Sequence, residues 1–333
     1  MNTRNGCHRG RLAGVALRSL ALFIIVLITS VHWTGEARAS AAPAVPTQQA
    51  LGRHFYLTPD LAYNGAAALT ACDAGFHMAS IWEIADVTNL IYDTGRGYIG
   101  ADSGLGAPSY VTGWARTGYY QASGEDTPGI GNCQLWTSSS NTDRGSVAYL
   151  SADWLTDPRI GGTEWTYMLF TCNTLRRVWC VEDYHPSWNV GSYYLTMDTY
   201  NGAEMLSACT NGYHVASMWE ILDPSALVYD TSLGYTQADS GQGPPSYQWA
   251  HGWIRAGNWA ADGSPVAGVA NCQAWTSNSP NAYGTFIDIR SDWTVERDIG
   301  IWLAFAGACN IERRVWCVRP PLRVYLPIVL RGL

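Results

Sequence analysis

Two Gly-rich segments carry charged residues at matching positions and could bind a ligand. The segments span residues 101–131 and 238–270, and they differ most from each other over 119–130 and 258–269. Loops that vary on a fixed scaffold are where binding residues usually lie. An Asp and an Arg flank each variable stretch. We therefore expect ligand-binding residues at four positions, which are Asp102, Arg116, Asp239 and Arg255.

A catalytic interpretation of the same region is weaker. Asp102, Ser103 and Gly104 resemble the nucleophile segment of serine proteases, with His77 and Asp93 upstream. His77 and Ser103 are only 26 residues apart, however, and the nucleophile elbow G-x-S-x-G is absent. The chain also contains no lysine, which excludes a lysine Schiff base and a P-loop lysine. We expect a tight Gly-rich turn here, and a protein that is not an enzyme.

The histidines and acidic loops do not predict a metal site. His77 and His214 occupy equivalent places, but single imidazoles rarely bind metal without further ligands. Glu125 and Asp126 lie in the variable loop of the first copy, and the second copy has only Asp262 there. Calcium prefers six to eight oxygen ligands, so we expect neither a metal nor any other cofactor.

The charge balance bears on possible partners. The chain has 20 basic and 27 acidic residues and a net charge of −7, so it lacks the basic surface of a nucleic-acid-binding protein. Two arginine pairs, Arg176-Arg177 and Arg313-Arg314, could bind an anionic glycan through bidentate contacts. We favour a solvated face for them.

Tryptophans are numerous enough to build both cores and a binding surface. Those that recur at matched places are expected in the cores, and they are Trp82/Trp219, Trp136/Trp275, Trp154/Trp293 and Trp179/Trp316. The others are better candidates for exposed binding residues, and they are Trp165, Trp188, Trp249, Trp259 and Trp302.

An internal repeat accounts for these paired positions. ACDAGFHMASIWEI begins at Ala71 and ACTNGYHVASMWEI at Ala208, and matching blocks continue in the same order up to RRVWCV in both copies. Repeats of this length are domains rather than solenoid units. We place repeat 1 at 54–183 and repeat 2 at 192–319, joined by a linker at 184–191. The linker is short, so contact between the repeats is expected.

Both ends of the chain lie outside the repeats. Arginines precede an apolar run from Leu20 to Val31, and small-x-small cleavage sites come after it, which is typical of a Sec-type signal peptide. We assign 1–41 to the signal peptide and cleavage region, 42–53 to a leader and 320–333 to an apolar tail. The tail is too short to span a bilayer. The expected location is outside the cell or on its surface, with no integral span after cleavage.

Eight cysteines remain after cleavage, four in each repeat at similar spacings. The first and last are 108 residues apart in both repeats. Export exposes them to an oxidising compartment, which favours disulfides over metal binding. If each repeat closes on itself in the same way, three pairings are possible, and spacing alone does not choose among them.

The pattern of elements indicates an α+β class. Asn64 and Asn201 are expected to cap a first short helix in each repeat. Ser80 to Glu83 and Ser217 to Glu220 match capping boxes that would open a second helix. Beyond about residue 95 the repeat is rich in Gly, Trp, Tyr, Thr and Ser, which favours short antiparallel strands and long loops.

Each repeat resembles the C-type-lectin-like superfold, and within it the endostatin-like branch that includes bacterial secreted proteins. The resemblance lies in an early helical cysteine, a Gly-aromatic-x-x-Ala-Ser segment, a Cys-x-x-Trp-Thr-Ser block and a closing Cys-x7-Cys. It implies tandem lectin-like domains, each with two helices. It also implies nested pairing, first with fourth and second with third, which gives Cys72–Cys180, Cys133–Cys172, Cys209–Cys317 and Cys272–Cys309.

The expected function is a non-enzymatic binding module with two similar domains, adhesive toward an extracellular glycan or matrix protein. Two tethered copies would gain avidity for a repeating ligand. The calcium-dependent sugar motifs of lectins, such as Glu-Pro-Asn, do not occur. The main alternative is a structural scaffold of the cell envelope, and a secreted hydrolase is a remote one. Fold analogy alone does not decide among them.

Overall fold

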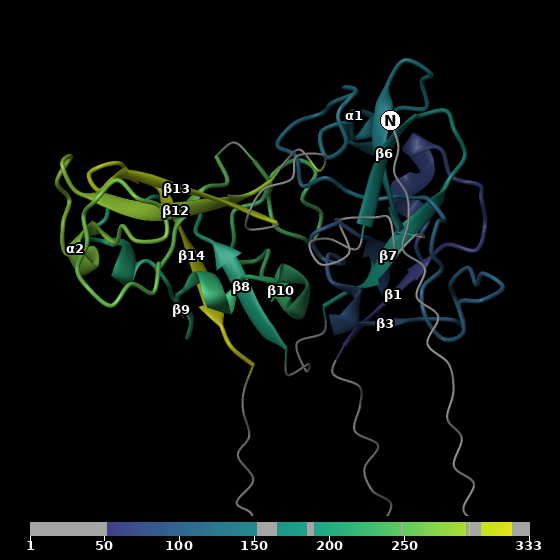
Figure 1. Ribbon diagram of the computed structural model, residues 1–333. Helices are drawn as coiled ribbons and strands as arrows, with labels where there is room; N and C mark the ends of the chain where they lie inside the picture. The colour runs from purple at the N-terminus through teal and green to yellow at the C-terminus, as the bar shows by residue number, and fades with distance from the viewer. Residues whose placement is uncertain are drawn as a thin grey trace, which may run out of the picture. The chain divides into compact units, whose positions relative to one another are not determined.

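Each repeat contains one mixed seven-stranded sheet, and the two sheets have the same strand order. In repeat 1 the order is β3-β1-β7-β4-β5-β6, with β2 also paired to β7, and in repeat 2 it is β10-β8-β14-β11-β12-β13, with β9 paired to β14 (Figure 1). The strands of repeat 1 are β1 (Arg53–Leu57), β2 (Phe76–Met78), β3 (Leu90–Tyr92), β4 (Gly113–Trp114), β5 (Arg144–Leu150), β6 (Trp165–Thr171) and β7 (Arg177–Glu182). Those of repeat 2 are β8 (Gly191–Leu195), β9 (His214–Val215), β10 (Leu227–Tyr229), β11 (Gly252–Trp253), β12 (Tyr283–Ile289), β13 (Trp302–Ala308) and β14 (Arg314–Arg319).

This computed structural model describes residues 52–151, 165–184, 190–247, 249–290, 293 and 301–321. All of them belong to one compact unit, Gln49–Leu333. The predicted signal peptide and cleavage region at 1–41, nearly all of the leader and most of the tail lie outside the described residues.

The central strand of each sheet is buried along its middle four residues. β7 lies between β1, its antiparallel neighbour, and β4, its parallel neighbour. Its residues Val178 to Val181 are all buried, as expected for a strand that is covered on both faces. Trp179 packs edge-to-face on Trp165 with ring centroids 4.9 Å apart, and Trp316 packs on Trp302 in the same way at 5.1 Å. Aromatic residues therefore dominate both cores.

The predicted α+β class, with two helices in each repeat, is wrong. The chain is mostly sheet, and its helical segments are short. They are the 3-10 helices η1 (Gly65–Thr70), η2 (Val87–Asn89), η3 (Met205–Ser207), η4 (Met218–Glu220) and η5 (Pro224–Ala226), with the four-residue segments α1 (Cys133–Trp136) and α2 (Cys272–Trp275).

Asn64 caps as predicted, whereas Asn201 does not cap η3, whose N-cap is Glu204, and neither residue starts a long helix. Asn64 Oδ1 accepts a hydrogen bond from Ala67 N at 3.0 Å and starts η1. Isolated helices shorter than about 12 residues are marginal in water, and here a left-handed glycine, Gly75, soon turns the chain into β2. The capping-box contact in repeat 1, from Ser80 N to Glu83 Oε2 at 3.0 Å, closes only a turn. Beyond that turn, Leu90 to Tyr92 form β3, which is parallel to β1.

The disulfides have the nested pairing that the resemblance implies. Cys72 bonds to Cys180 and Cys133 to Cys172 in repeat 1. In repeat 2, Cys209 bonds to Cys317 and Cys272 to Cys309. The outer bridge of each repeat closes 108 residues of chain, and the inner bridge closes 39 or 37. A crosslink that closes a loop of this length lowers the entropy of the unfolded chain. In the loop-entropy model this stabilises the fold by about 3–5 kcal/mol.

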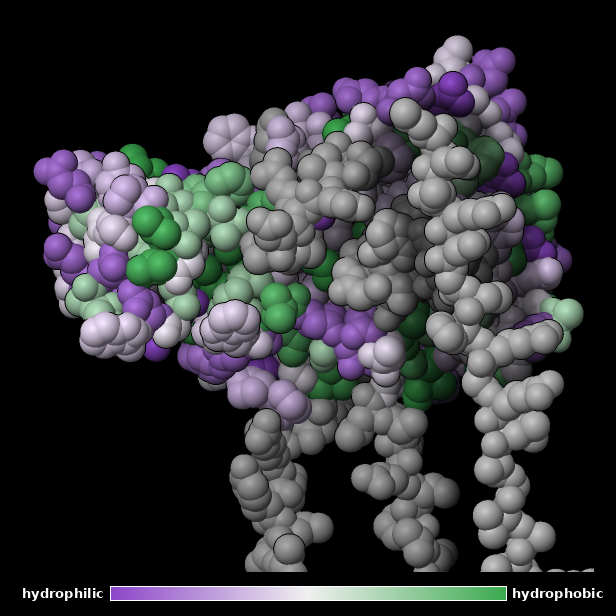
Figure 2. Space-filling view, viewed as in Figure 1, coloured by the Kyte–Doolittle hydropathy of each residue, from purple (hydrophilic) through white to green (hydrophobic). Residues whose placement is uncertain are grey.

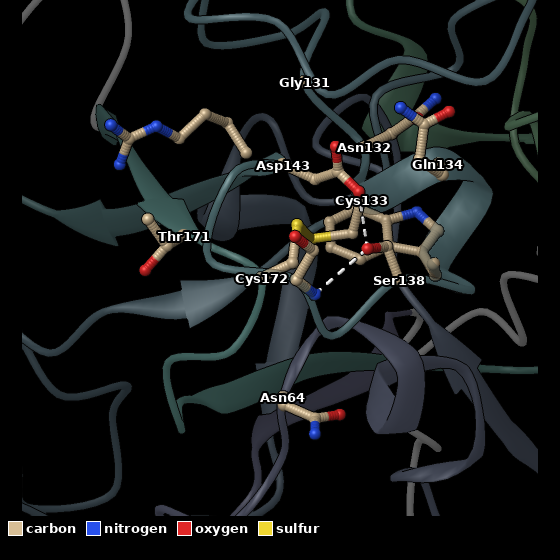
Figure 3. Close-up of a disulfide and its surroundings, with 12 residues drawn as sticks. Asn64, Gly131, Asn132, Cys133, Gln134, Ser138, Asp143, Thr171 and Cys172 are labelled. Carbon is tan, nitrogen blue, oxygen red and sulfur yellow. Dashed lines mark hydrogen bonds between the residues drawn. A yellow bond between two sulfur atoms is a disulfide. The ribbon is translucent and has the colours of Figure 1, made fainter.

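The inner bridge anchors an unusual left-handed turn (Figure 3). All four residues of α1, and all four of α2, have positive φ between 48° and 63° although none is glycine. This conformation costs roughly 1–2 kcal/mol per residue, so the surroundings must hold it. Asn132 does so from one side, accepting a hydrogen bond from Leu135 N at 3.0 Å, and the disulfide of Cys133 does so from the other. The turn thereby fixes the place of Trp136.

Candidate functional site

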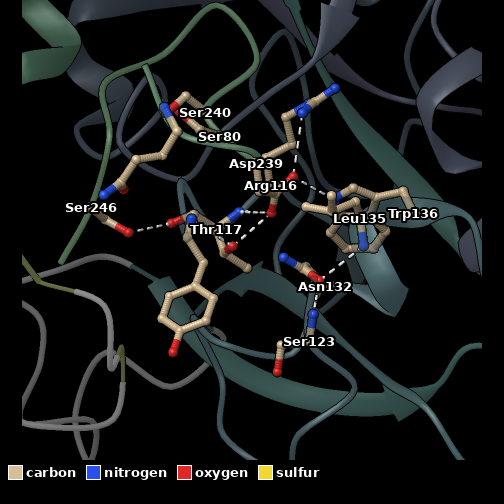
Figure 4. A network of polar contacts seen from close by, with 12 residues as sticks. Ser80, Arg116, Thr117, Ser123, Asn132, Leu135, Trp136, Asp239, Ser240 and Ser246 are labelled. Atoms are coloured by element: carbon tan, nitrogen blue, oxygen red, sulfur yellow. Dashed lines mark hydrogen bonds and ion pairs between the residues drawn. The ribbon is translucent and has the colours of Figure 1, made fainter. Parts of the chain in front are cut away.

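A buried carboxylate of repeat 2 lies inside a polar network built by repeat 1 (Figure 4). Asp239 has no exposed surface. Its Oδ2 accepts hydrogen bonds from Thr117 N at 3.0 Å and Thr117 Oγ1 at 2.6 Å. Its Oδ1 accepts one from Trp136 Nε1 at 2.8 Å and forms an ion pair with Arg116 Nη1 at 3.3 Å. Two of the four predicted binding residues, Arg116 and Asp239, thus bind each other across the repeats.

The main chains of the two repeats are also joined at this point. Gly118 N donates to Asp239 O at 3.2 Å, and Asp239 N donates to Tyr119 O at 3.0 Å. A few residues later, Ser246 N donates to Gly118 O at 3.0 Å, while Ser246 Oγ donates to Thr117 O at 2.9 Å. Both ends of residues 239–246, which we call the inserted loop, therefore hydrogen-bond to the same short stretch of repeat 1, residues 117–119. The surface that receives them is the receiving face, made of Ser80, Trp82, Arg116, Thr117, Gly118, Tyr119 and Trp136.

Burial and hydrogen bonding act in opposite directions on the carboxylate. Burial raises the pKa of Asp239 above its usual 3.8, while the Arg116 guanidinium and the donors on Thr117 and Trp136 pull that pKa down. A buried ion pair of this kind adds little net stability, but removing one partner is costly because a charge stays behind unpaired. Loss of either Arg116 or Asp239 alone should therefore weaken the contact between the repeats.

A second charged cluster borders the receiving face. Glu83 is buried and contacts both Arg53 Nη2 at 3.1 Å and His77 Nε2 at 3.0 Å. Burial alone would raise the pKa of Glu83, but the His77 ring, Arg53 and the Ser80 N–H hold it well below 4.5. His77 Nδ1 lies 2.7 Å from Asp183 Oδ1, which in turn accepts a hydrogen bond from Gln242 Nε2 of the inserted loop at 3.0 Å. The cluster thus adds a further contact between repeats.

The other two predicted binding residues are exposed and separate. Asp102 is the counterpart of Asp239, and Arg255 is the counterpart of Arg116. Neither Asp102 nor Arg255 has an ion-pair partner among the described residues. Part of the equivalent surface on repeat 2 is open: Trp219 is 73% exposed, whereas its counterpart Trp82 packs against Trp293 and is 4% exposed, and Trp275 is buried. We call this surface of repeat 2 the free face, made of Ser217, Trp219, Arg255, Ala256, Gly257, Asn258 and Trp275. Residues 102–109 of repeat 1 are the free loop.

Sequence comparison of the repeats did not single out every residue of this network. Thr117 is replaced by Ala256 and Tyr119 by Asn258 in repeat 2. This difference within a matched block was the only feature of the sequence that could have pointed to these two residues. Trp136, expected to be core, is 1% exposed and also donates to Asp239. Nothing in the local sequence shows that a core indole donates to another repeat.

The tryptophan predictions are only partly right. Trp249 and Trp259 are exposed, as expected, at 61% and 96%. Trp165 and Trp302 are fully buried and occupy equivalent strand positions, opposite Leu150 and Ile289. Among the matched residues, Trp219 is exposed, against expectation. Trp154 and Trp188 lie outside the described residues.

The arginine pairs are stacked on aromatic rings rather than surrounded by solvent. The guanidinium carbon of Arg176 lies 3.6 Å from the centre of the Phe170 ring, and that of Arg177 lies 3.8 Å from Tyr98. Arg313 and Arg314 repeat this over Phe286 at 3.7 Å and Tyr235 at 3.6 Å. Burial lowers the pKa of Arg176, Arg313 and Arg314. Cation–π contact explains these residues as parts of the sheet surface.

The residues considered for catalysis and metal binding have other partners. Both ring nitrogens of His77 face carboxylates, and Ser103 Oγ accepts a hydrogen bond from Gly100 N at 3.0 Å, as in a tight turn. His214 Nε2 contacts Glu220 Oε1 at 2.7 Å. Within the ranges that the structure describes, no group of three or more His, Cys, Asp or Glu side chains is placed to hold a metal ion.

The molecular surface is mixed in polarity. On the face drawn in Figure 2, apolar residues form small patches between polar ones. Among the described residues, no helix has the length and apolar character needed to cross a membrane. No protein-family model, curated protein or solved structure matches the chain. The endostatin-like resemblance therefore stays a prediction, and the two-helix fold that it implied is replaced by the mixed sheets.

Proposed function

We propose that the protein is a non-enzymatic extracellular binding module and that the free face on repeat 2 is its binding surface. The observation that carries the proposal is that the same surface on repeat 1 already binds a protein loop. There it provides a guanidinium, an indole N–H and main-chain groups to residues 239–246. A surface that binds one loop in repeat 1 is suited to bind a similar partner in repeat 2.

The backbone of the free face matches that of the receiving face. Gly257 has φ 72° where Gly118 has φ 71°, and Trp275 has φ 63° where Trp136 has φ 60°. Asn271 Oδ1 accepts a hydrogen bond from Ala274 N at 2.8 Å, as Asn132 does from Leu135 N. A preformed surface loses little entropy on binding. The left-handed turn is thus in place before any ligand arrives.

The disulfides support the extracellular setting. Four bridges close loops in both repeats, and such bridges persist in oxidising compartments. The signal peptide predicted at 1–41 agrees with this setting and is a separate proposal.

A structural scaffold is the second candidate, favoured by the buried Asp239 network. That network uses one copy of the surface inside the molecule, so the two matched ligand sites first expected are reduced to one free site. The proposal therefore no longer includes avidity from two equivalent faces.

An array of immobilised ligands tests the function. The array carries glycans, matrix proteins and the protein itself, and it is probed with the exported chain and two variants, Arg255→Glu and Trp219→Ala. Both residues are exposed, so the variants should fold normally. We expect both to lose binding while Met197→Ala, at a residue that is 56% exposed after β8, retains it. Binding that is equal in all four proteins, or no binding at all, would contradict the proposal.

A further inference from the structure

The contact between the repeats leaves one copy of each of its two surfaces unused. Repeat 1 has a receiving face that is occupied and a loop that is free, and repeat 2 has the reverse. A contact of this kind is heterologous, since the two surfaces in it differ. The free loop of repeat 1 is therefore equivalent to the inserted loop, and the free face of repeat 2 is equivalent to the receiving face.

The free loop keeps the residues that the inserted loop uses. Both loops contain Asp-Ser-Gly, a second glycine two residues later and a Pro-Ser-Tyr ending. Asp239 and Ser246 are fully buried by repeat 1, whereas Asp102 and Ser109 are exposed. The free loop thus has the side chains that make the contact between the repeats, but in repeat 1 they contact no residue of the other repeat that the structure describes.

The second glycine is the most specific sign of a missing partner. A Cβ at Gly243 would lie 2.4 Å from Ser80 Oγ of the receiving face, so close approach of the repeats requires glycine there. Its counterpart Gly106 has no positive φ, and the nearest atom to a Cβ at that position would be Ser103 O at 3.4 Å. Repeat 1 itself therefore gives no reason for glycine at 106, whereas docking like that of the inserted loop does.

We infer that the free loop of one molecule binds the free face of a second copy, head to tail. This inference rests on the proposed function of the free face and names its ligand. By analogy with the internal contact, Asp102 pairs with Arg255 and accepts a hydrogen bond from Trp275 Nε1. The main chain of Gly257 binds both ends of the loop, as Gly118 does. One carboxylate of the loop thus meets one guanidinium of the face.

The contact between copies lacks some features of the internal one. Ala256 stands where Thr117 donates its hydroxyl, and Asn258 stands where Tyr119 stacks on Tyr247. The two η segments that also join the repeats, through Ser225 Oγ and Asp86 N at 3.3 Å, are already in use. Association between copies therefore has fewer contacts than the internal one, which also lies within a single chain. Because each molecule has one loop and one face, association continues into chains or closes into rings.

Complementation between two single variants tests this inference. Arg255→Glu removes the face and keeps the loop, whereas Gly106→Ala adds a methyl group to the loop and keeps the face. Sedimentation velocity of the exported protein over a concentration series measures the mass of each. We expect wild-type mass to rise above that of one chain with concentration. Each variant alone should weaken association about tenfold or more, since a charge is left unpaired or the close approach is blocked.

The mixture gives the decisive result. Equal amounts of the two variants should form a dimer and nothing larger, because only one intact face and one intact loop are left in each pair. Wild-type protein that stays monomeric, or variants that associate like wild type, would overturn the inference. The ligand array separates this from the proposed function: binding to another macromolecule that Arg255→Glu abolishes would keep the free face and remove the second copy as its ligand.

Discussion

Arg116 Nη1 lies 3.3 Å from Asp239 Oδ1, and the two residues are 123 positions apart in sequence. Their counterparts, Arg255 and Asp102, are exposed and have no ion-pair partner within the described part of the chain. One pair of charges thus joins the repeats, while the equivalent pair is left on the outer surfaces. The copies have the same residues but different surroundings, so the effects of a mutation depend on the repeat in which it is made.

Truncation of the same loop residue in the two repeats should affect stability very differently. Asp239→Ala leaves Arg116, Trp136 Nε1 and the Thr117 hydroxyl without their acceptor, and we expect the free energy of unfolding to fall by about 3–5 kcal/mol. Asp102→Ala is the matched control, and at an exposed position it should change that free energy by less than about 0.5 kcal/mol. Urea unfolding measures both. Equal losses would show that Asp239 is not specially placed.

Restoring a lost hydroxyl should strengthen association between copies. In Ala256→Thr, the new hydroxyl can donate to Asp102 as Thr117 Oγ1 donates to Asp239 at 2.6 Å. Hydrogen bonds to charged groups contribute about 1.5–3 kcal/mol, so the dissociation constant should fall by about tenfold or more. Sedimentation velocity measures it. The double variant Ala256→Thr with Asp102→Asn is the control, and a gain of the same size in that background would argue against the pairing.

The sequence predicted the repeat and the charged positions, but not which of them would meet. Disulfide positions and buried aromatic blocks reflect local pattern, because the same residues face the core in both repeats. The partner of Asp239 is not set by local pattern, since it depends on how two folded units dock. The helices failed for a different reason. Asn64 and Ser80 do cap local turns, but a cap does not set the length of the helix after it. The segment that follows, Leu90 to Tyr92, pairs with β1 as a strand instead of extending a helix.

The loss of folding stability at low pH should depend on Glu83. Its pKa in the folded protein lies well below 4.5, so the carboxylate contributes stability above pH 4.5 that is lost as the pH falls toward the folded value. Asp239 acts in the opposite direction, because its raised pKa favours the folded state below pH 3.8 and that contribution is lost as the pH rises. We expect Glu83→Gln to lower the free energy of unfolding at pH 7, and the difference from wild type to shrink below pH 4.5.

Glu220→Gln is the matched control for this prediction. Glu220 contacts His214 and Ser217 as Glu83 contacts His77 and Ser80, but its side chain is 38% exposed where that of Glu83 is 5% exposed. Burial raises and the Ser217 and His214 contacts lower its pKa, with a net decrease. Solvent weakens exposed ion pairs, so its pH-dependent loss should be smaller. Urea unfolding from pH 3 to pH 7 compares the variants, and parallel curves for wild type and Glu83→Gln would contradict the assignment.

The left-handed turn should respond to glycine in the reverse of the usual way. Gln134 has φ 55° in the middle of α1, where a side chain costs roughly 1–2 kcal/mol and glycine costs none. Glycine also gives the unfolded chain more freedom, which offsets about 0.5–1 kcal/mol of the gain. We therefore expect Gln134→Gly to raise the free energy of unfolding by up to about 1 kcal/mol, and Gln134→Val to lower it, because a β-branched residue is least tolerated at positive φ. Gln273→Gly, at φ 54° in repeat 2, should have the same sign as Gln134→Gly. If both glycine variants are less stable than wild type in urea unfolding, the turn is not left-handed in solution, and the placement of Trp136 beside Asp239 needs another explanation.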